Sequence, residues 1–265
     1  MAAIPNILLR LLARKDYLHL ASGLTPVALK FGQVLYEPGK PMRHVYFPSV
    51  CLISLLTIPE GHLALEVGMV GPEGMLGIPL ALGIPVSPVR ALVQGEGTAL
   101  RMSRSRFLAE LRSSPPLQRT VLTYVHALMG QITQTAACNR FHVVESRLAR
   151  WLLMTRDRVA SGEFRMTHEF LSHMLGVRRE GVSEAAAGFQ QRHLIEYSRG
   201  KIRILDHAGL EAASCSCYRC AAKAVGDIPR WRPPRPYAAE AATTLRVSTR
   251  GRSDIRRSNS TLTTL

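Results

Sequence analysis

Apolar positions along this chain follow two different periods, and the change of period divides it into regions. From residue 27 to residue 102, short apolar runs are separated by turns rich in glycine and proline. Closely spaced short strands with such joints are typical of an antiparallel sandwich or barrel, so we expect an all-β domain here. The expected strands are residues 34–36, 45–47, 52–58, 63–70, 90–94 and 98–102, with a short helix at 74–82.

Helical spacing dominates on both sides of this region. Residues 1–25 and 103–112 are expected to be helical, and the second of these helices begins at a serine N-cap. After a Ser-Ser-Pro-Pro break at 113–116, a long helix is expected over residues 117–137. It carries a coiled-coil-like seam, with apolar residues at alternating spacings of three and four. The seam residues are Leu117, Val121, Tyr124, Leu128, Ile132 and Thr135. We expect this helix to dimerise; the alternative is that the seam packs on the chain's own β domain.

The most informative segment is residues 167–189, which predict two short helices joined by a tight turn. Thr167 is a good N-cap, because its hydroxyl can accept a backbone N–H of the first turn. Gly176 stands where the first helix must end in a left-handed residue. The second helix opens with Arg178 and Arg179, and arginines at an exposed helix N-terminus suit the DNA major groove. The alternative is an ordinary helical hairpin with a solvated charged face.

The pattern around this segment predicts a winged helix. Residues 142–159 favour a helix that follows a bend at residues 138–139, and a brief strand is expected at 164–166. Residues 194–205 predict a β-hairpin whose turn, at 198–201, reads Ser-Arg-Gly-Lys. The basic tip of such a hairpin is placed to contact a phosphate backbone.

Charge narrows the class of partner. The 265 residues carry a formal net charge of +15, which favours a polyanionic partner. Residues 226–265 hold eight arginines against three acidic residues, and the rest of the chain stays basic without them. This tail is rich in proline, arginine, serine and threonine, so we expect it to be disordered.

The sequence also bears on location and metal binding. No apolar run approaches the length of a membrane span, and the N-terminus does not resemble a signal peptide, so a cytoplasmic location without membrane contact is expected. Five cysteines argue against a secreted disulfide framework. Cys215, Cys217 and Cys220 are weak candidates for zinc ligands, with His207 as a fourth ligand. The alternative is that they are ordinary reduced thiols. We favour this alternative and expect no metal and no cofactor.

A β domain, a long helix and a winged helix, in this order, resemble the CRP/FNR family of bacterial transcription regulators. The resemblance spans residues 20–207 and is strongest over Met166–Leu205. It implies an α+β fold with an N-terminal cyclic-nucleotide-binding-like β-barrel of the jelly-roll type, a long dimerisation helix and a C-terminal winged helix-turn-helix. The expected domains are residues 1–112 (sensor), 113–140 (dimerisation helix), 141–207 (DNA binding) and 208–265 (a cysteine-containing segment and the tail).

The resemblance also implies which residues read DNA. The family uses an Arg-Glu pair at the start of the recognition helix, and Arg179 and Glu180 match it. Arginine can bind guanine O6 and N7, and glutamate can accept from cytosine N4. The family's further arginine is replaced by Glu184, so a different half-site sequence is expected, with Arg178 as the candidate to compensate. The complete predicted interface is Thr167, Arg178, Arg179, Glu180, Ser183, Glu184, Arg199 and Lys201.

The family's effector residues are incomplete. Gly74 matches a glycine of the cyclic-nucleotide pocket, but Met75 replaces the glutamate that follows it, and Arg90 comes late for the phosphate-binding arginine. A buried phosphate without its counter-charge is costly, so cyclic AMP is not expected to bind in the family's usual way. The alternative is a shifted anion site using Glu73 and Arg90. The candidate pocket residues are Glu73, Gly74, Met75, Gly77 and Arg90. No cysteine precedes Cys51, so the family's N-terminal iron–sulfur cluster is not expected.

These features together predict a homodimeric, sequence-specific DNA-binding transcription regulator. Its expected partner is double-stranded DNA with a pseudo-palindromic operator, and RNA polymerase is a candidate second partner. The alternative is a ligand- or partner-binding regulatory module whose winged helix docks on protein. An enzyme is not expected, because no phosphate loop, nucleophile elbow, zinc-protease helix or plausible carboxylate pair occurs in the sequence.

Overall fold

The computed structural model describes residues 4–60, 64–159 and 163–227. The tail that the sequence predicts to be disordered therefore lies outside the described residues, except for its first two positions. No helix within the described ranges is both long and apolar enough to cross a bilayer.

Two short helices begin the chain, where the sequence predicted continuous helix. They are α1 (Ile7–Arg10) and α2 (Arg14–Ala21). Asn6 fixes α1, because its side-chain oxygen accepts from the Leu9 N–H at 3.0 Å while its amide donates to the Pro48 and Gly74 carbonyls at 2.8 and 2.9 Å. A polar residue thus holds the N-terminal segment on the β domain.

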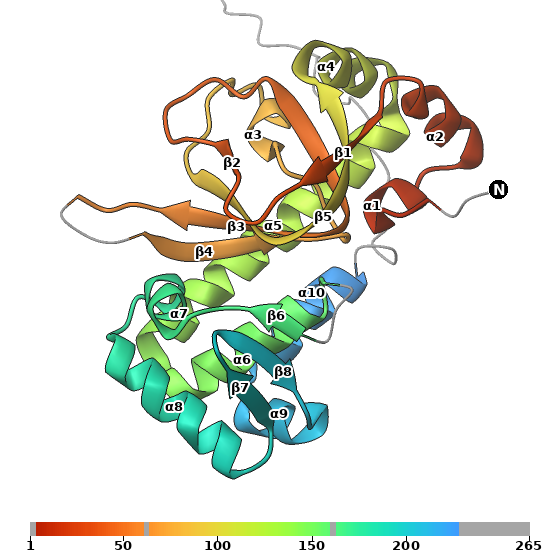
Figure 1. Ribbon diagram of the computed structural model, residues 1–265. Coiled ribbons are helices and arrows are strands. Elements are labelled where there is room, and N and C mark those ends of the chain that lie inside the picture. Colours follow the sequence, from red (N-terminus) through yellow and green to blue (C-terminus); the bar gives the residue numbers. More distant parts are fainter. Residues whose placement is uncertain (1–3, 61–63, 160–162, 228–265) are drawn as a thin grey trace, which may run out of the picture. The chain divides into compact units, whose positions relative to one another are not determined.

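The β domain is a five-stranded antiparallel sheet (Figure 1). Its strands are β1 (Thr25–Leu29), β2 (Val34–Tyr36), β3 (His44–Thr57), β4 (Leu65–Val70) and β5 (Arg90–Ser103). They follow the order β1-β5-β3-β4, and β2 also pairs with β5. The predicted fold class is confirmed, but the described strands form an open sheet rather than a closed barrel.

Two predicted strand breaks are wrong, because β3 and β5 each run through a pair of expected strands. Residues 48–49 (Pro-Ser) and 95–97 (Gly-Glu-Gly), which we expected to separate strands, lie within the β3–β5 pairing. The register of the two strands shifts there, where Pro48 faces Ala99 and Leu52 faces Gly95. A Cβ added at Gly97 would lie 1.6 Å from the Val50 carbonyl oxygen. Glycine here permits a close approach of two strands and does not make a turn.

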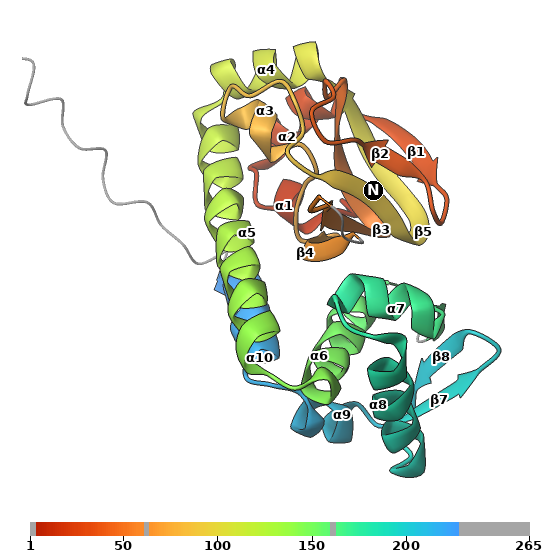
Figure 2. The ribbon, with the colours of Figure 1, turned by 90° about the vertical axis from the view of Figure 1, so that its left-hand side faces the viewer.

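Three helices follow or interrupt the sheet: α3 (Ile78–Ala81), α4 (Arg104–Ser113) and α5 (Pro115–Phe141). Ser103 caps α4 and Ser114 caps α5, each by accepting an N–H from three residues onward. Figure 2 shows α5 as one long continuous helix. The bend expected at residues 138–139 is therefore misplaced, since the chain leaves the helix at His142, whose backbone is extended.

The apolar seam of α5 faces inward. Leu117, Val121, Tyr124 and Leu128 are buried in the same core as the sheet residues around Phe47. The alternative interpretation, packing on the chain's own β domain, is confirmed for these four residues. A different face of α5 stays open, where Leu122 is 54% exposed and Met129 is 63% exposed.

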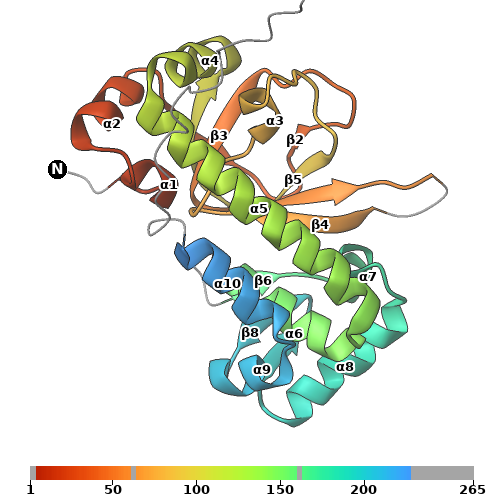
Figure 3. The same cartoon turned by 180° about the vertical axis from the view of Figure 1, so that it is seen from behind.

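The C-terminal elements form the predicted winged helix, with Trp151, Leu171, Val182, Phe189 and Ile202 in its core. Its sheet has the order β6-β8-β7. The elements are α6 (Val144–Arg156), β6 (Glu163–Arg165), α7 (His168–Leu175), α8 (Arg179–Gln191), β7 (Ile195–Ser198) and β8 (Lys201–Ile204). Two further helices, α9 (His207–Ala213) and α10 (Cys217–Asp227), were not expected from the sequence, and α10 packs against α5 (Figure 3).

Candidate nucleic-acid interface

The turn between α7 and α8 has the predicted geometry. The Thr167 hydroxyl accepts from the Phe170 N–H at 3.1 Å, which caps α7. Gly176 ends that helix in the left-handed region, with φ at 60°. The Val177 N–H donates to the Ser172 carbonyl at 3.0 Å and closes the helix end. The chain is thereby redirected into α8 within a few residues.

The start of α8 points its charged side chains outward. Arg178 occupies the N-cap position, and Arg179 and Glu180 form the exposed first turn. Glu184 lies exposed one turn further on. None of these four forms an ion pair within the described part of the chain, so their charges are available to a partner. The other side of the helix is buried in the winged-helix core.

His168 joins three elements of this surface. Its ring stacks on Tyr197 of β7, with centroids 4.4 Å apart and planes 18° apart, and its Nδ1 lies 2.8 Å from Ser183 Oγ of α8. Burial, with a smaller effect from Arg179, lowers the pKa of His168 and favours the neutral ring. Local sequence gives no signal for this role, since the partners of His168 are distant along the chain.

Ser183 is placed differently from the other predicted interface residues. Its hydroxyl donates to the Arg179 carbonyl at 3.1 Å and contacts His168, and its side chain is only partly exposed. Ser183 therefore links the first turn of α8, through the Arg179 carbonyl, to His168 at the start of α7.

The tip of the wing is a tight two-residue turn. Arg199 and Gly200 have φ values of 50° and 75°, as a type I′ hairpin turn requires. Arg199 is exposed and forms no ion pair within the described residues. Lys201, by contrast, pairs with Glu163 at 3.0 Å. The free positive charge of the wing tip is thus concentrated on Arg199.

A hollow of about 460 Å³ lies between the wing, the start of α7 and the start of α8. Thr167, His168, Arg179 and Arg199 contribute to its lining, and Glu169 is the acidic residue at its edge. Two arginines and the N-terminus of a helix converge on this space, and both features attract anions. The arrangement suits a phosphodiester group.

The predicted effector residues do not form one site. The Glu73 carboxylate is buried against Arg158, with Nε and Oε1 2.8 Å apart, while Arg90 pairs with Glu37 at the surface. Met75 is fully buried, and a Cβ at Gly74 would lie 2.1 Å from the Tyr124 ring. Gly77 adopts a φ of 114° close to Val45, so a glycine is required there by the backbone conformation and not by a ligand. The shifted anion site of Glu73 and Arg90 is therefore not formed, and the absence of ordinary cyclic AMP binding stays a prediction.

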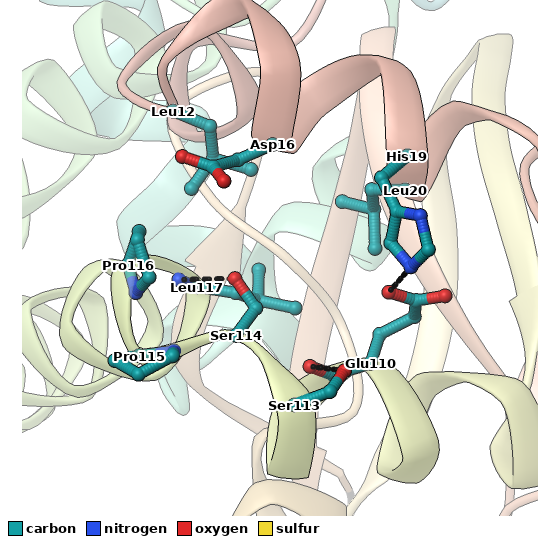
Figure 4. A pocket seen from close by; sticks show the side chains of 10 residues that line it. All are labelled: Leu12, Asp16, His19, Leu20, Glu110, Ser113, Ser114, Pro115, Pro116 and Leu117. Atoms are coloured by element: carbon teal, nitrogen blue, oxygen red, sulfur yellow. Dashed lines mark hydrogen bonds and ion pairs between the residues drawn. The ribbon is translucent and has the colours of Figure 1, made fainter.

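A second hollow, of about 210 Å³, lies between α2 and the junction of α4 and α5 (Figure 4). Its buried carboxylate, Glu110, already pairs with His19 at 3.2 Å and with Arg106 at 2.7 Å. Ser114 accepts from the Leu117 N–H there. The His19–Glu110 contact joins α2 to α4, and the Ser114 contact caps α5, so these groups have a structural role.

The cysteines are arranged differently from the sequence interpretation. Cys215 and Cys217 are buried beside Cys138 and His142, whereas Cys220 is exposed. His207 is not part of the group. Sequence spacing could not reveal this arrangement, because Cys138 and His142 approach only when α10 packs against α5.

Comparisons with known proteins agree with this architecture. Residues 146–213 match the model of the Crp-like helix-turn-helix domain. No curated protein sequence matches the chain. A regulator of the crp/fnr family from Eubacterium rectale is 16% identical with a TM-score of 0.62, covering 80% of this chain and 99% of that one.

Two other solved structures share the fold. FixK2 from Bradyrhizobium japonicum is 14% identical with a TM-score of 0.62, over 72% of this chain and 98% of its own. A CRP-family transcriptional regulator from Thermus thermophilus is 19% identical with a TM-score of 0.60, over 71% of this chain and 96% of its own.

Proposed function

We propose that this DNA-binding transcription regulator, which joins a Crp-like helix-turn-helix domain to the fold of the CRP/FNR family, binds a pseudo-palindromic operator as a homodimer. The observation that carries the proposal is the exposed first turn of α8, where unpaired charges lie beside the wing tip. We place its action in the cytoplasm, with RNA polymerase as the second partner.

Each interface residue has a role that its position supports. Arg179 binds the O6 and N7 edge of guanine, and Glu180 accepts from cytosine N4. Arg178 binds a phosphate or a neighbouring base. Thr167 and Arg199 border the anion-attracting hollow and hold the phosphate backbone, which sets the register of the helix. Lys201 contributes less, because Glu163 already neutralises it.

Two features of α8 set the specificity. Glu184 is exposed on the same helix, one turn after the Arg-Glu pair, and an acidic side chain there repels phosphate and favours a cytosine donor. The half-site sequence should therefore differ from that bound by a recognition helix with a second arginine at this position. His168 and Ser183 keep the first turn of α8 aligned with the wing.

The dimer uses the open face of α5. Leu122, Met129 and Ala136 are exposed and recur every seven residues, with the exposed His126 and Thr133 between them. This spacing is that of a two-helix seam. Pairing along it presents two recognition helices to half-sites about one helical turn, roughly 34 Å, apart.

The test is the loss of specific binding when the leading arginine is removed. Operators are first selected from a random DNA pool with purified protein, and binding is then measured by gel shift. Replacing Arg179 with alanine should weaken specific binding by about 1–3 kcal/mol and relax the preference at one base position. Arg112→Ala, an exposed arginine on α4, serves as the matched control. An unaltered footprint for Arg179→Ala would contradict the assignment, and selection of no sequence at all would favour a protein-docking winged helix.

A further inference from the structure

Four metal-ligating side chains meet where the long helix ends. Cys138 lies in the last turn of α5 and His142 follows the helix, while Cys215 precedes α10 and Cys217 opens it. The ligand atoms of all four lie within 4.8 Å of one another. Cys138 Sγ is 3.5 Å from Cys215 Sγ, and Cys217 Sγ is 3.4 Å from His142 Nδ1.

The two contacting pairs stand at nearly the distances found around a single tetrahedral ion. Zinc binds sulfur at about 2.3 Å and nitrogen at about 2.0–2.1 Å, so its ligand atoms stand roughly 3.5–3.8 Å apart. The cysteines of a four-iron cluster ligate different irons and stand further apart. The three cysteine side chains are buried, as in a closed structural site, and His142 is partly exposed.

The charges around the group favour an anionic centre. Zinc with three thiolates and a neutral imidazole has a net charge of −1. Arg147 and Arg150 are only 6% and 4% exposed, and neither forms an ion pair within the described ranges. Arg147 is within electrostatic reach of Cys138 and Cys215, and Arg150 is within reach of Cys138 as well as of Glu66. Buried cations need such compensation.

Outer contacts also resemble those of a metal site. The Gln134 side-chain amide donates to Cys217 Sγ at 3.0 Å, which is how outer residues orient metal-bound groups. Arg147 in turn donates to the Asn139 side chain at 3.0 Å. Gln134 of α5 therefore holds Cys217, and Arg147 of α6 is itself fixed by its bond to Asn139.

We propose that Cys138, His142, Cys215 and Cys217 bind one structural zinc ion. Binding releases the thiol protons and fastens the start of α10 to the end of α5. The ion thus secures the junction at which the chain passes from the long helix into the winged helix. The proposal is independent of the proposed DNA contacts. It keeps Cys215 and Cys217 of the sequence-based set and replaces Cys220 and His207 with Cys138 and His142.

The experiment measures metal in the untagged full-length chain, purified under reducing conditions. We expect about one zinc per chain by mass spectrometry of the metal. Cys217→Ser should lose at least about tenfold in zinc affinity, and so should His142→Gln. Cys220→Ser and Cys51→Ser are matched controls and should keep the metal, since neither residue belongs to the group.

A second readout covers the case in which a variant does not fold. Cobalt added to the metal-free wild-type protein should give the visible spectrum of tetrahedral thiolate coordination, and zinc should displace it. A folded, reduced wild-type protein that binds neither ion would overturn the proposal. So would zinc loss in Cys220→Ser equal to that in Cys217→Ser, or a Cys138–Cys215 disulfide that persists in reductant and excludes metal.

Discussion

At the scale of single residues, Glu66 shows how the fold controls a charge. This carboxyl group on β4 is buried and accepts from Ser54 Oγ at 2.5 Å and from Trp151 Nε1 at 3.0 Å. Burial raises its pKa from 4.5 to about 7. Because Trp151 belongs to α6, one carboxyl group connects the sheet with the winged helix.

The raised pKa makes stability depend on pH in a defined direction. Below pH 4.5 Glu66 is neutral in both states. Between pH 4.5 and about 7 only the unfolded state ionises, so the free energy of unfolding falls as pH rises, by on the order of 3 kcal/mol, and then levels off. Glu66→Gln should remove this part of the slope in urea unfolding at pH 5 and pH 8. Glu96→Gln, at an exposed position, should keep it; equal slopes in wild type and Glu66→Gln would count against the prediction.

The same scale shows what local sequence could reveal. Thr167 and Gly176 were assigned correctly, because a cap and a left-handed helix end are local requirements. The role of His168 could not be predicted, because its partners Ser183 and Tyr197 are distant along the chain. The pairing of Glu73 could not be predicted for a similar reason, since its partner Arg158 follows α6 and is distant along the chain.

At the scale of elements, the wing combines strain with exposed charge. Arg199 occupies a left-handed position, which costs a side-chain-bearing residue roughly 1–2 kcal/mol and which asparagine tolerates better. Arg199→Asn should therefore raise the free energy of unfolding by about 0.5–1 kcal/mol. It should also weaken DNA binding and reduce the salt slope by about 1, because one phosphate contact is lost.

Measurements of unfolding in urea and of DNA affinity over a range of salt concentrations check both parts of this prediction. Arg112→Asn is the control for a general loss of positive charge. A more stable Arg199→Asn protein with an unaltered salt slope would show that the wing tip does not touch phosphate.

Elements with local signals were predicted well, and those defined by packing were not. The two motif helices and the hairpin were found from capping, spacing and turn residues. The long strands were divided in error, because Gly97 was interpreted as a turn residue when it accommodates the Val50 carbonyl. Helix α10 was missed, since its place depends on contacts with α5.

At the scale of the whole molecule, the long helix separates two kinds of apolar residue. The seam that begins at Leu117 packs against the sheet. The smaller exposed stripe, which contains Leu122 and Met129, is free to contact a second chain. Periodicity predicted that α5 has an apolar face, but it could not show which of two partners that face meets.

The stripe gives a test of assembly. Replacing Leu122 and Met129 together with glutamate should convert the dimer to monomer, because two like charges would face each other in the interface. Sedimentation velocity measures the outcome, and operator affinity should fall with it. Leu82→Glu, also at an exposed leucine, is the control and should stay dimeric. A doubly substituted protein that remains a dimer would place the interface elsewhere.

The length of α5 has a mechanical consequence. Its 27 residues contain no proline after the first turn and span about 40 Å. A rotation of about 5° at the Pro115 end would move the Phe141 end by roughly 3–4 Å, which is about the rise of one base pair along DNA. A stiff helix of this length therefore converts a small rotation, which would not repack the sheet, into a displacement of the winged helix by about one base pair along DNA.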